Sequence, residues 1–371
     1  MFSEIPVMRP VMPPLSSLQS RLAVIEQSGV FSNFGPQHEE FRNRLAEKLG
    51  TSAARVQLAS SATLAICGAV AVLGGQRWLC PAFTFPATAH GALHAGVTLE
   101  FGDIHNSDWS LDVPQSSAAL GEFDGYLVVA PFGAPVPSSV TGRLAGRRVV
   151  VDAAASLGSH LMRAPLELGN EMAVVFSLHA TKVLGVAEGA VVVFGSDEVS
   201  ADYRSWSNFG FAGARISQRR GLNAKMSEVV AALGLTALDH WNEELDEWSA
   251  ARQSTLQIGD ELGVQTFLAD QPLVTPYWIA LLRSRLDRDA IQTDLRRVGI
   301  ETRLWWSDGC HRMPAFKDLK SADLAVTEDV CARYLGLPMF RRMESRSLKR
   351  LREALRTSLI AIGHRSERPN C

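Results

Sequence analysis

The sequence predicts an α/β fold in which a mainly parallel sheet is covered by helices on both faces. Three observations support this prediction: apolar residues make up 46% of the 371 residues, short Val-rich runs recur between about residues 50 and 195, and helical stretches separate several of these runs. Strands buried on both faces are almost continuously apolar, and parallel neighbours need a crossover that is usually a helix. The composition also provides enough apolar material for a large core.

Six predicted strands share a run of apolar residues that is bounded by glycine, proline or charged residues. They are RWLCPAF (77–83), TLEFGDI (98–104), GYLVVAPF (125–132), RRVVVDAA (147–154), MAVVFSL (172–178) and GAVVVFG (189–195). Helical patterns cover residues 62–74 and 87–96. Because ligand sites in parallel sheets lie beyond the carboxyl ends of the strands, we expect functional residues directly after these runs.

The C-terminal part of the chain has a different organisation. Residues 223–250 have the pattern of one long amphipathic helix. The apolar run 271–282 and the charged helical stretch after it predict a second α+β unit, which ends in a basic helix over residues 345–359. We interpret this helix as a solvated helix face. The sequence therefore predicts a large domain over residues 1–250, including the N-terminal segment, and a small domain over residues 251–371.

The bulk properties exclude several classes of function. The chain has 37 Lys plus Arg and 39 Asp plus Glu, so a net charge of −2 provides no basic field for a nucleic acid or an anionic membrane. No apolar run reaches about 18 residues, and the N-terminus lacks the apolar region of a signal peptide. Five scattered cysteines without a CxxC pair indicate neither a disulfide framework nor a zinc site. We expect a cytoplasmic enzyme without a metal, which would need a local anion site to bind a phosphorylated ligand.

Lys182 lies in a polar turn between two predicted strands, in the segment FSLHATKVLGVAEG. A lysine at the end of a buried strand needs a partner for its amine. A desolvated amine with a lowered pKa attacks a carbonyl carbon, which is how lysines that form imines work. Taken alone, the spacing from Ser177 to Lys182 is weak support for this chemistry, because most lysines are exposed and have no chemical role.

Asp152 follows three valines and precedes three alanines at the end of another predicted strand. A carboxylate in this position must be paired or hydrogen-bonded, because burying an unpaired charge is very unfavourable. A protonated pyridine nitrogen is one suitable partner, and a carboxylate there makes a pyridine cofactor a better electron sink. An aspartate that caps the following helix is an equally good interpretation.

Two further segments are compatible with a planar, phosphorylated ligand. Ser60, Ser61 and Thr63 open the predicted helix 62–74, where free N–H groups and hydroxyls form an anion site. An ordinary serine N-cap is the better interpretation of this segment viewed alone. Phe83 and Phe85 follow the first predicted strand, and one of them is a candidate to stack on a planar ring. Core packing explains either phenylalanine equally well.

In their order along the chain, these segments resemble the DegT/StrS family of pyridoxal-phosphate-dependent sugar aminotransferases, which have the aspartate aminotransferase fold (fold type I). The blocks that carry the resemblance are FSNFGPQHEEFRNRLAEKLG, SSATLAI, PAFTFPATAHGALHAGVTLEFGDI, VVVDAAASLG, SLHATKVLGVAEGA, RGLNAKMSEVVAALGLTALD and LGLPMF. Each block is weak alone, but their occurrence in order is specific and covers nearly the whole chain. The resemblance implies a seven-stranded, mainly parallel sheet in the large domain.

The resemblance also implies roles for individual residues. Lys182 would form an imine with pyridoxal 5'-phosphate and then carry a proton between cofactor and substrate, while Asp152 would face the pyridine nitrogen. The other implied cofactor-binding residues are Ser61, Ala62, Thr63 and Ser177 at the phosphate, Phe85 (or, second, Phe83) on the ring, and Asn223 at the phosphate of a neighbouring subunit's cofactor. The role of Asn223 implies a homodimer with shared active sites.

The chain departs from the family pattern at two places. Ala155 stands where the family usually has a glutamine that bonds the cofactor's ring hydroxyl, and residues 187–190 read Ala-Glu-Gly-Ala where the family has Gly-Glu-Gly-Gly. An alanine cannot donate the hydrogen bond, and one neutral bond of this kind contributes about 0.5–1.5 kcal/mol. The two alanines matter only where the replaced glycine needs a positive φ.

The resemblance implies a two-stage transamination. An amino acid, with glutamate as the expected donor, would leave the cofactor as pyridoxamine 5'-phosphate, which would then aminate a keto sugar. The expected acceptor is a nucleotide-linked keto-deoxysugar for a surface polysaccharide or a secondary metabolite. Two alternatives stay open: a sugar dehydratase of the same family, although that branch has His in place of Lys182, and a catalytically silent, regulatory cofactor-binding protein, which Ala155 favours.

The block ETRLWWSDGCHRMPAF (301–316) has an unusual aromatic and basic character. Its Arg and Trp residues, with His311, are candidates to contact the sugar or its nucleotide. Core tryptophans and solvated arginines are the interpretation that we favour for this segment.

Overall fold

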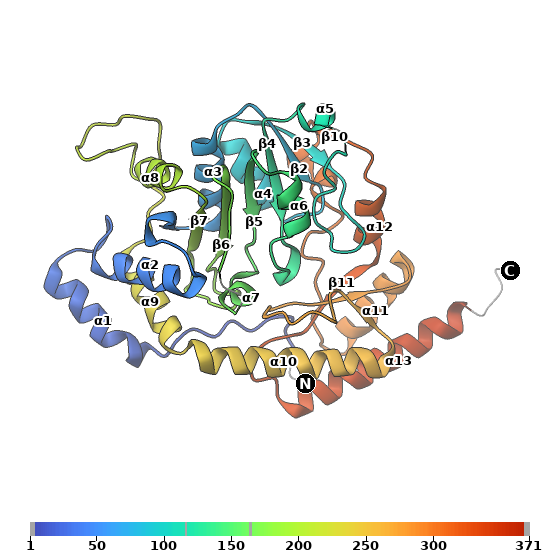
Figure 1. Ribbon diagram of the computed structural model, residues 1–371. Coiled ribbons are helices and arrows are strands. Elements are labelled where there is room, and N and C mark those ends of the chain that lie inside the picture. Colours follow the sequence, from blue (N-terminus) through green and yellow to red (C-terminus); the bar gives the residue numbers. More distant parts are fainter. Residues whose placement is uncertain (1–3, 116, 163–164, 367–371) are drawn as a thin grey trace.

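The computed structural model describes residues 4–115, 117–162 and 165–366. At its centre is an eight-stranded sheet with the order β1-β7-β6-β5-β4-β2-β3-β10 (Figure 1). The strands are β1 (Val56–Ala59), β2 (Arg77–Pro81), β3 (Thr98–Gly102), β4 (Gly125–Val129), β5 (Arg148–Asp152), β6 (Met172–Ser177), β7 (Ala190–Phe194) and β10 (Lys320–Ser321). Of these strands β7 runs in the opposite direction to the others, so it is antiparallel to both β1 and β6, and the remaining pairs are parallel.

The prediction of a mainly parallel sheet is therefore confirmed, and all six predicted strands are present as β2 to β7. The four-residue strand β1 and the two-residue strand β10 were not predicted. Two apolar clusters lie on the two faces of the sheet. Val149 and Val151 of β5 belong to one cluster and Val150 to the other, because successive side chains of a strand point to opposite faces.

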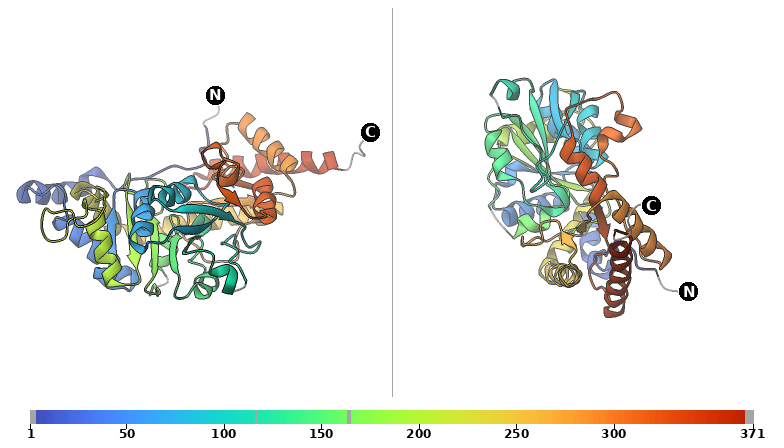
Figure 2. Two further views of the ribbon diagram at one scale, coloured as in Figure 1. Left: turned by 90° about the horizontal axis from the view of Figure 1, so that it is seen from above. Right: turned by 90° about the vertical axis from the view of Figure 1, so that its right-hand side faces the viewer.

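Helices cover both faces of the sheet, as the separate views in Figures 1 and 2 show. The α-helices of the described chain are α1 (Leu15–Ser28), α2 (Pro36–Leu49), α3 (Ala62–Leu73), α4 (Pro86–His94), α5 (Ser117–Leu120), α6 (Ser138–Arg143), α7 (Leu157–Leu161), α8 (Asp197–Trp206), α9 (Glu228–Asp239), α10 (Trp241–Leu262), α11 (Arg285–Arg297), α12 (Ala325–Arg333) and α13 (Ser345–Ser366). The predicted helices over 62–74 and 87–96 correspond to α3 and α4. None of the described helices combines the length and the apolar composition needed to cross a bilayer.

The stretch 223–250 forms two helices, so the prediction of one continuous helix is wrong. Ser227 caps α9, since its hydroxyl accepts a hydrogen bond from the N–H of Val230 at 3.3 Å. The residues before it form isolated bridges instead of a helix, Asn223 with Asn208 and Lys225 with Ala59. The second helix, α10, begins after His240.

A second, antiparallel sheet has the order β11-β9-β8 and consists of β8 (Gln265–Thr266), β9 (Trp278–Leu281) and β11 (Tyr334–Leu337). The helices α10 and α11 pack against its strands, and α13 packs against these two helices. Backbone contacts join the two parts of the chain. For example, Ile5 forms a bridge with Ile300, and β10 joins the edge of the large sheet at β3. Since α10 crosses residue 250, we keep the division into domains 1–250 and 251–371 as a proposal.

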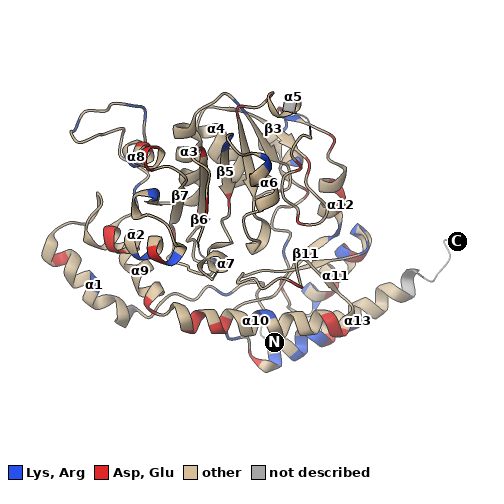
Figure 3. Ribbon diagram, viewed as in Figure 1, with Lys and Arg blue, Asp and Glu red and all other residues tan. Residues whose placement is uncertain are grey.

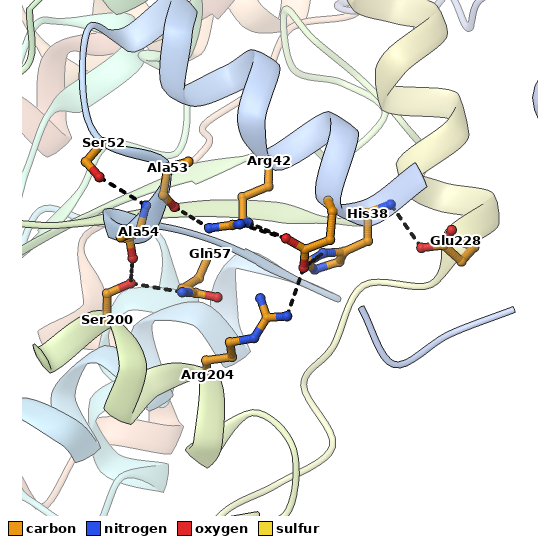
Figure 4. Close-up of polar contacts among 10 residues, drawn as sticks. His38, Arg42, Ser52, Ala53, Ala54, Gln57, Ser200, Arg204 and Glu228 are labelled. Atoms are coloured by element: carbon orange, nitrogen blue, oxygen red, sulfur yellow. Dashed lines mark hydrogen bonds and ion pairs between the residues drawn. The ribbon is translucent and has the colours of Figure 1, made fainter. Parts of the chain in front are cut away.

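Hydrogen bonds tie α2 to α8 and α9 (Figure 4). The buried carboxylate of Glu228 accepts hydrogen bonds from the N–H groups of Gln37 at 2.7 Å and His38 at 2.9 Å, so it satisfies free donors at the start of α2. Glu39 of the same helix forms an ion pair with Arg204 of α8 at 2.8 Å. In Figure 3 the charged residues of α10 are mostly acidic, whereas those of α13 are mostly basic.

Candidate active site

A cavity of about 530 Å³ lies beyond the carboxyl ends of β4, β5 and β6. These strands are parallel, so the residues that follow them meet at one edge of the sheet, as expected for this kind of fold. The volume of the cavity is typical of a site for a small molecule. Residues of the C-terminal part of the chain complete the wall, namely Tyr277, Arg303, Trp305 and Trp306.

Asp152, the last residue of β5, is 6% exposed and lines this cavity. Its Oδ2 accepts a hydrogen bond from the Thr88 hydroxyl at 2.6 Å, and its Oδ1 accepts one from the Ala154 N–H at 3.1 Å. Burial raises the pKa of Asp152, while these two hydrogen bonds and the charge of Lys182 oppose the rise. The carboxylate is thus oriented but still penalised by desolvation, which a cationic partner in the cavity would relieve.

Lys182 lies in the loop between β6 and β7, and backbone hydrogen bonds shape this loop. The Leu178 N–H donates to the Gly189 carbonyl at 2.8 Å, and the Ala180 N–H donates to the Ala187 carbonyl at 2.9 Å. The Lys182 side chain points into the cavity region, where its Nζ donates a hydrogen bond to the Tyr277 hydroxyl at 2.8 Å. The lysine is therefore held between the large sheet and a residue next to β9.

The two alanines that replace family glycines lie in this loop and at the start of the strand that follows it. Ala187 has φ +83°, a conformation that is unfavourable for a residue with a Cβ atom. Ala190 is the first residue of β7, where the extended backbone accepts a side chain readily. One of the two replacements therefore strains the loop that carries Lys182, and the other does not.

Three hydroxyl residues lie along the cavity wall where the sequence predicted a phosphate site. Ser61 caps α3, because its Oγ accepts a hydrogen bond from the Leu64 N–H at 3.3 Å, and Thr63 lies in the first turn of the helix. Ser177 is the last residue of β6 and is 6% exposed. The N-cap interpretation of Ser61 is thus correct, and it is compatible with an anion at the helix start, where further N–H groups are free to bind it.

The structure separates the two candidate phenylalanines. Phe85 lines the cavity and is 53% exposed, whereas Phe83 is fully buried. The Phe83 ring packs edge-on against Trp109, Trp306 and Tyr334, with the shortest centroid separation, 4.6 Å, to Trp306. Phe83 is therefore a core residue, and Phe85 is the aromatic side chain available to a ring in the cavity.

Asn223 does not line the cavity. It is exposed on the segment before α9, and its Oδ1 accepts a hydrogen bond from Lys225 Nζ at 2.8 Å. This position is compatible with a role toward a second subunit, which the single chain does not test. All the other predicted site residues line the one cavity: Ser61, Ala62, Thr63, Phe85, Asp152, Ser177 and Lys182.

Sequence reasoning missed Tyr277 and Thr88. Thr88 lies in the first turn of α4, a segment for which the sequence predicted a helix and no site residue. Nothing in the run TPYWIALL indicates that Tyr277 reaches Lys182.

The aromatic and basic block 301–316 divides into two parts. Its first part reaches the cavity through Arg303 and two tryptophans, whereas Arg312 forms an ion pair with Glu328 outside it.

The residues of the cavity fit pyridoxal phosphate. A buried carboxylate at the end of β5 offers a partner for a protonated ring nitrogen, and the Lys182 amine faces the same space. The capped start of α3 and the hydroxyl of Ser177 offer donors for a phosphate. Ala155 also lines the wall and, as expected, offers a methyl group and no donor.

Known proteins are similar to this chain in sequence and in structure. The sequence profile of the DegT/DnrJ/EryC1/StrS aminotransferase family matches residues 16–356. Protein Rv3402c of Mycobacterium tuberculosis is 31% identical over 96% of this chain and 90% of its own length. A dTDP-4-amino-4,6-dideoxy-D-glucose transaminase of Shigella dysenteriae is 27% identical over 94% of this chain and 98% of its own. The crystal structure of DesI with its TDP-sugar product superposes with a TM-score of 0.86 at 30% identity, covering 98% of this chain and 96% of that one.

Proposed function

Because this chain belongs to the DegT/DnrJ/EryC1/StrS aminotransferase family, whose members depend on pyridoxal phosphate, we propose that it moves an amino group from an amino acid to a keto sugar. The observation that carries the proposal is the meeting of Lys182 and Asp152 in one cavity at the carboxyl edge of the sheet. The proposed donor is glutamate. The overall reaction balances as amino acid plus keto sugar giving keto acid plus amino sugar.

When bound, pyridoxal phosphate supplies an electron sink for the negative charge that develops at the reacting carbon. The protein's part is to bind, orient and transfer a proton. Asp152, held by Thr88 and the Ala154 N–H, stabilises a positive charge at the ring nitrogen. The Lys182 amine provides the covalent attachment point and then accepts and returns the proton as general base and acid. Phe85 and the hydroxyls near α3 orient the ring and the phosphate.

We propose a nucleotide-linked keto-deoxysugar as the acceptor. Arg303 supports this choice, because it lines the cavity and its guanidinium lies 4.8 Å from the Trp305 ring centroid. The side chain is about half exposed, and it also forms an ion pair with Glu301 at 2.5 Å. An exposed cation beside an aromatic face is suited to a sugar that carries a diphosphate. The transaminase of Shigella dysenteriae and DesI, whose names specify dTDP- and TDP-sugars, support the same class of acceptor.

The proposal includes a homodimer with shared active sites, in which Asn223 contacts the partner's cofactor, and a cytoplasmic location. Exposed apolar side chains near Asn223 support an interface on this face, since Phe209 and Leu222 are 46% and 45% exposed. Sedimentation of the loaded wild type and of Asn223→Ala checks the dimer. Loss of cofactor affinity in a variant that remains dimeric is the expected result for a shared site.

The decisive experiment follows the bound cofactor and the products together. Glutamate added to the loaded protein should replace the visible absorbance of the lysine-linked cofactor by that of the aminated form, with release of one equivalent of keto acid. A nucleotide-linked keto sugar should then restore the visible band, and mass spectrometry should detect the amino sugar. For acceptors that are hard to prepare, a panel of amino sugars with 2-oxoglutarate tests the reverse reaction.

Two results would contradict the proposal. A spectrum that responds to no amino donor would favour a regulatory cofactor-binding protein. A product that has lost a hydroxyl group without gaining nitrogen would identify a dehydratase.

A further inference from the structure

The Lys182 amine and the Tyr277 hydroxyl form a contact that the proposed reaction does not yet use. Lys182 Nζ lies 2.8 Å from the phenol oxygen and 5.2 Å from the centroid of the ring. Tyr277 immediately precedes β9, so a residue of the smaller sheet contacts the reactive amine. In the free enzyme the ammonium group donates, and the phenol oxygen accepts.

The hydroxyl of Tyr277 is held in a defined position. The side chain is 9% exposed, and its backbone N–H donates to the Thr275 hydroxyl at 3.3 Å. That hydroxyl in turn donates to the Phe132 carbonyl at 2.6 Å. The phenol ring packs edge-on against Phe132 and Trp305, with centroid separations of 5.4 and 5.1 Å. Neighbours on both sides therefore fix the position of the ring and of its hydroxyl oxygen.

Ala155 belongs to the same apolar cluster as Tyr277. It lines the cavity with a methyl group, which cannot donate a hydrogen bond to a bound ligand. The ring oxygen of pyridoxal phosphate is attached next to the carbon that carries the aldehyde, so it lies close to any nitrogen bonded to that aldehyde carbon. When Lys182 Nζ bonds to this carbon, a C=N bond replaces the C=O bond and the oxygen leaves as water. The nitrogen then donates less to Tyr277, whose O–H becomes available to an acceptor nearby.

We propose that Tyr277 is a positioning residue that first holds the Lys182 amine and then donates a hydrogen bond to the ring oxygen of the bound cofactor, where Ala155 cannot. The donor stabilises the anionic form of that oxygen and so favours loss of the proton that it shares with the lysine nitrogen. This inference rests on the cofactor chemistry of the proposed function and is independent of the identity of the sugar.

The test is a pH titration of the visible absorbance of the loaded protein. Removal of the donor in Tyr277→Phe should raise the titration midpoint by about half to one pH unit, since the proton-free form loses one neutral hydrogen bond. The other titratable groups of the cavity, Asp152, His179, Glu188 and Arg303, are unchanged in this variant.

Tyr126→Phe is the matched control. Tyr126 is fully buried, and its hydroxyl donates to the Leu120 carbonyl at 2.6 Å, away from the cavity, so its midpoint should equal that of the wild type. Equal midpoints in the wild type and Tyr277→Phe would overturn the proposal. The absence of any visible band in the wild type would overturn the proposed function as well, which distinguishes the two failures.

A second measurement keeps the phenol side chain of Tyr277 and changes only its strength as a hydrogen-bond donor. Incorporation of 3-fluorotyrosine at the four tyrosines makes each phenol a stronger donor, and the midpoint should then fall. The same labelling of Tyr277→Phe should leave its midpoint where it was. A midpoint that does not fall in the labelled wild type would overturn the proposal even if Tyr277→Phe does not fold.

Discussion

The Thr88 hydroxyl donates a 2.6 Å hydrogen bond to Asp152 and lies 2.7 Å from the hydroxyl of Thr84. Since Thr88 gives its own proton to the carboxylate, Thr84 donates to Thr88 in turn. This chain of two threonines from the start of α4 orients a carboxylate at the end of β5. The arrangement counteracts the desolvation that raises the pKa of Asp152, and it leads to the first prediction.

We expect Thr88→Val to weaken cofactor binding, most strongly at acidic pH. The Thr88 hydrogen bond stabilises the charged carboxylate, so its loss should raise the pKa of Asp152 further. The acid limb of cofactor affinity against pH, followed by fluorescence quenching, should therefore move to higher pH. Thr357→Val on α13 is the control, and identical acid limbs in both variants would argue against this role of Thr88.

Lys182→Ala should lose both the covalent link to the cofactor and the proton carrier. The visible band of the lysine-linked cofactor should be absent, and kcat should fall by about 10²–10⁴-fold, the usual contribution of a general acid and base. Lys349→Ala removes an exposed lysine of α13 and should behave as the wild type. A variant at residue 182 that keeps the visible band would exclude Lys182 as the attachment point.

Ala187→Gly should stabilise the protein by about 0.5–1 kcal/mol. Ala187 adopts φ +83°, where a glycine avoids the strain of the Cβ atom by more than it loses in chain entropy. Ala190→Gly, three positions further along the chain, is the matched comparison. Ala190 is in β7, so this variant should lose about 0.5–1 kcal/mol of stability. Urea denaturation measures both, and a shift of the two variants in the same direction would contradict the assignment.

Glu39 should stabilise the fold at neutral pH and contribute less in acid. Burial would raise the pKa of Glu39, but hydrogen bonds from His38 and Arg204 and the charges of Arg204 and Arg42 outweigh it and hold the pKa well below its usual range. A carboxylate with a lowered folded pKa contributes stability above its unfolded pKa of about 4.3, and this stability is lost as pH falls through the folded value. Glu39→Gln should therefore lower the free energy of unfolding by about 1–2 kcal/mol at pH 7.

The pH dependence of this difference in stability shows whether Glu39 acts through its charge. The difference between the wild type and Glu39→Gln should shrink as the pH is lowered below about 4, because the Glu39 carboxylate of the unfolded chain then gains a proton while that of the folded protein stays charged. Glu26→Gln, at an exposed position of α1, serves as the control at each pH. A difference that stays constant from pH 7 into acid would show that Glu39 acts through packing and not through its charge.

The local pattern of the sequence determined the sheet and the two residues on which its chemistry is centred. Strands that are buried on both faces are apolar along almost their whole length, so β2 to β7 were recognisable without any contact information. Lys182 and Asp152 stood out because charged groups at the ends of such strands need partners, and parallel neighbours bring their carboxyl ends to one edge. The link to pyridoxal phosphate came from the order of the family blocks.

Tertiary structure decided what depends on contacts between distant segments. The local pattern does not distinguish Phe83 from Phe85, and the resemblance only ranks Phe85 first. The packing of Trp109, Trp306 and Tyr334 around Phe83 leaves Phe85 as the one that lines the cavity. The contact of Tyr277 with Lys182 spans 95 positions and two sheets, so no local periodicity encodes it. Such contacts form only when helices and strands from distant parts of the chain pack together. Close packing and the pairing of buried polar groups therefore depend on the whole folded chain.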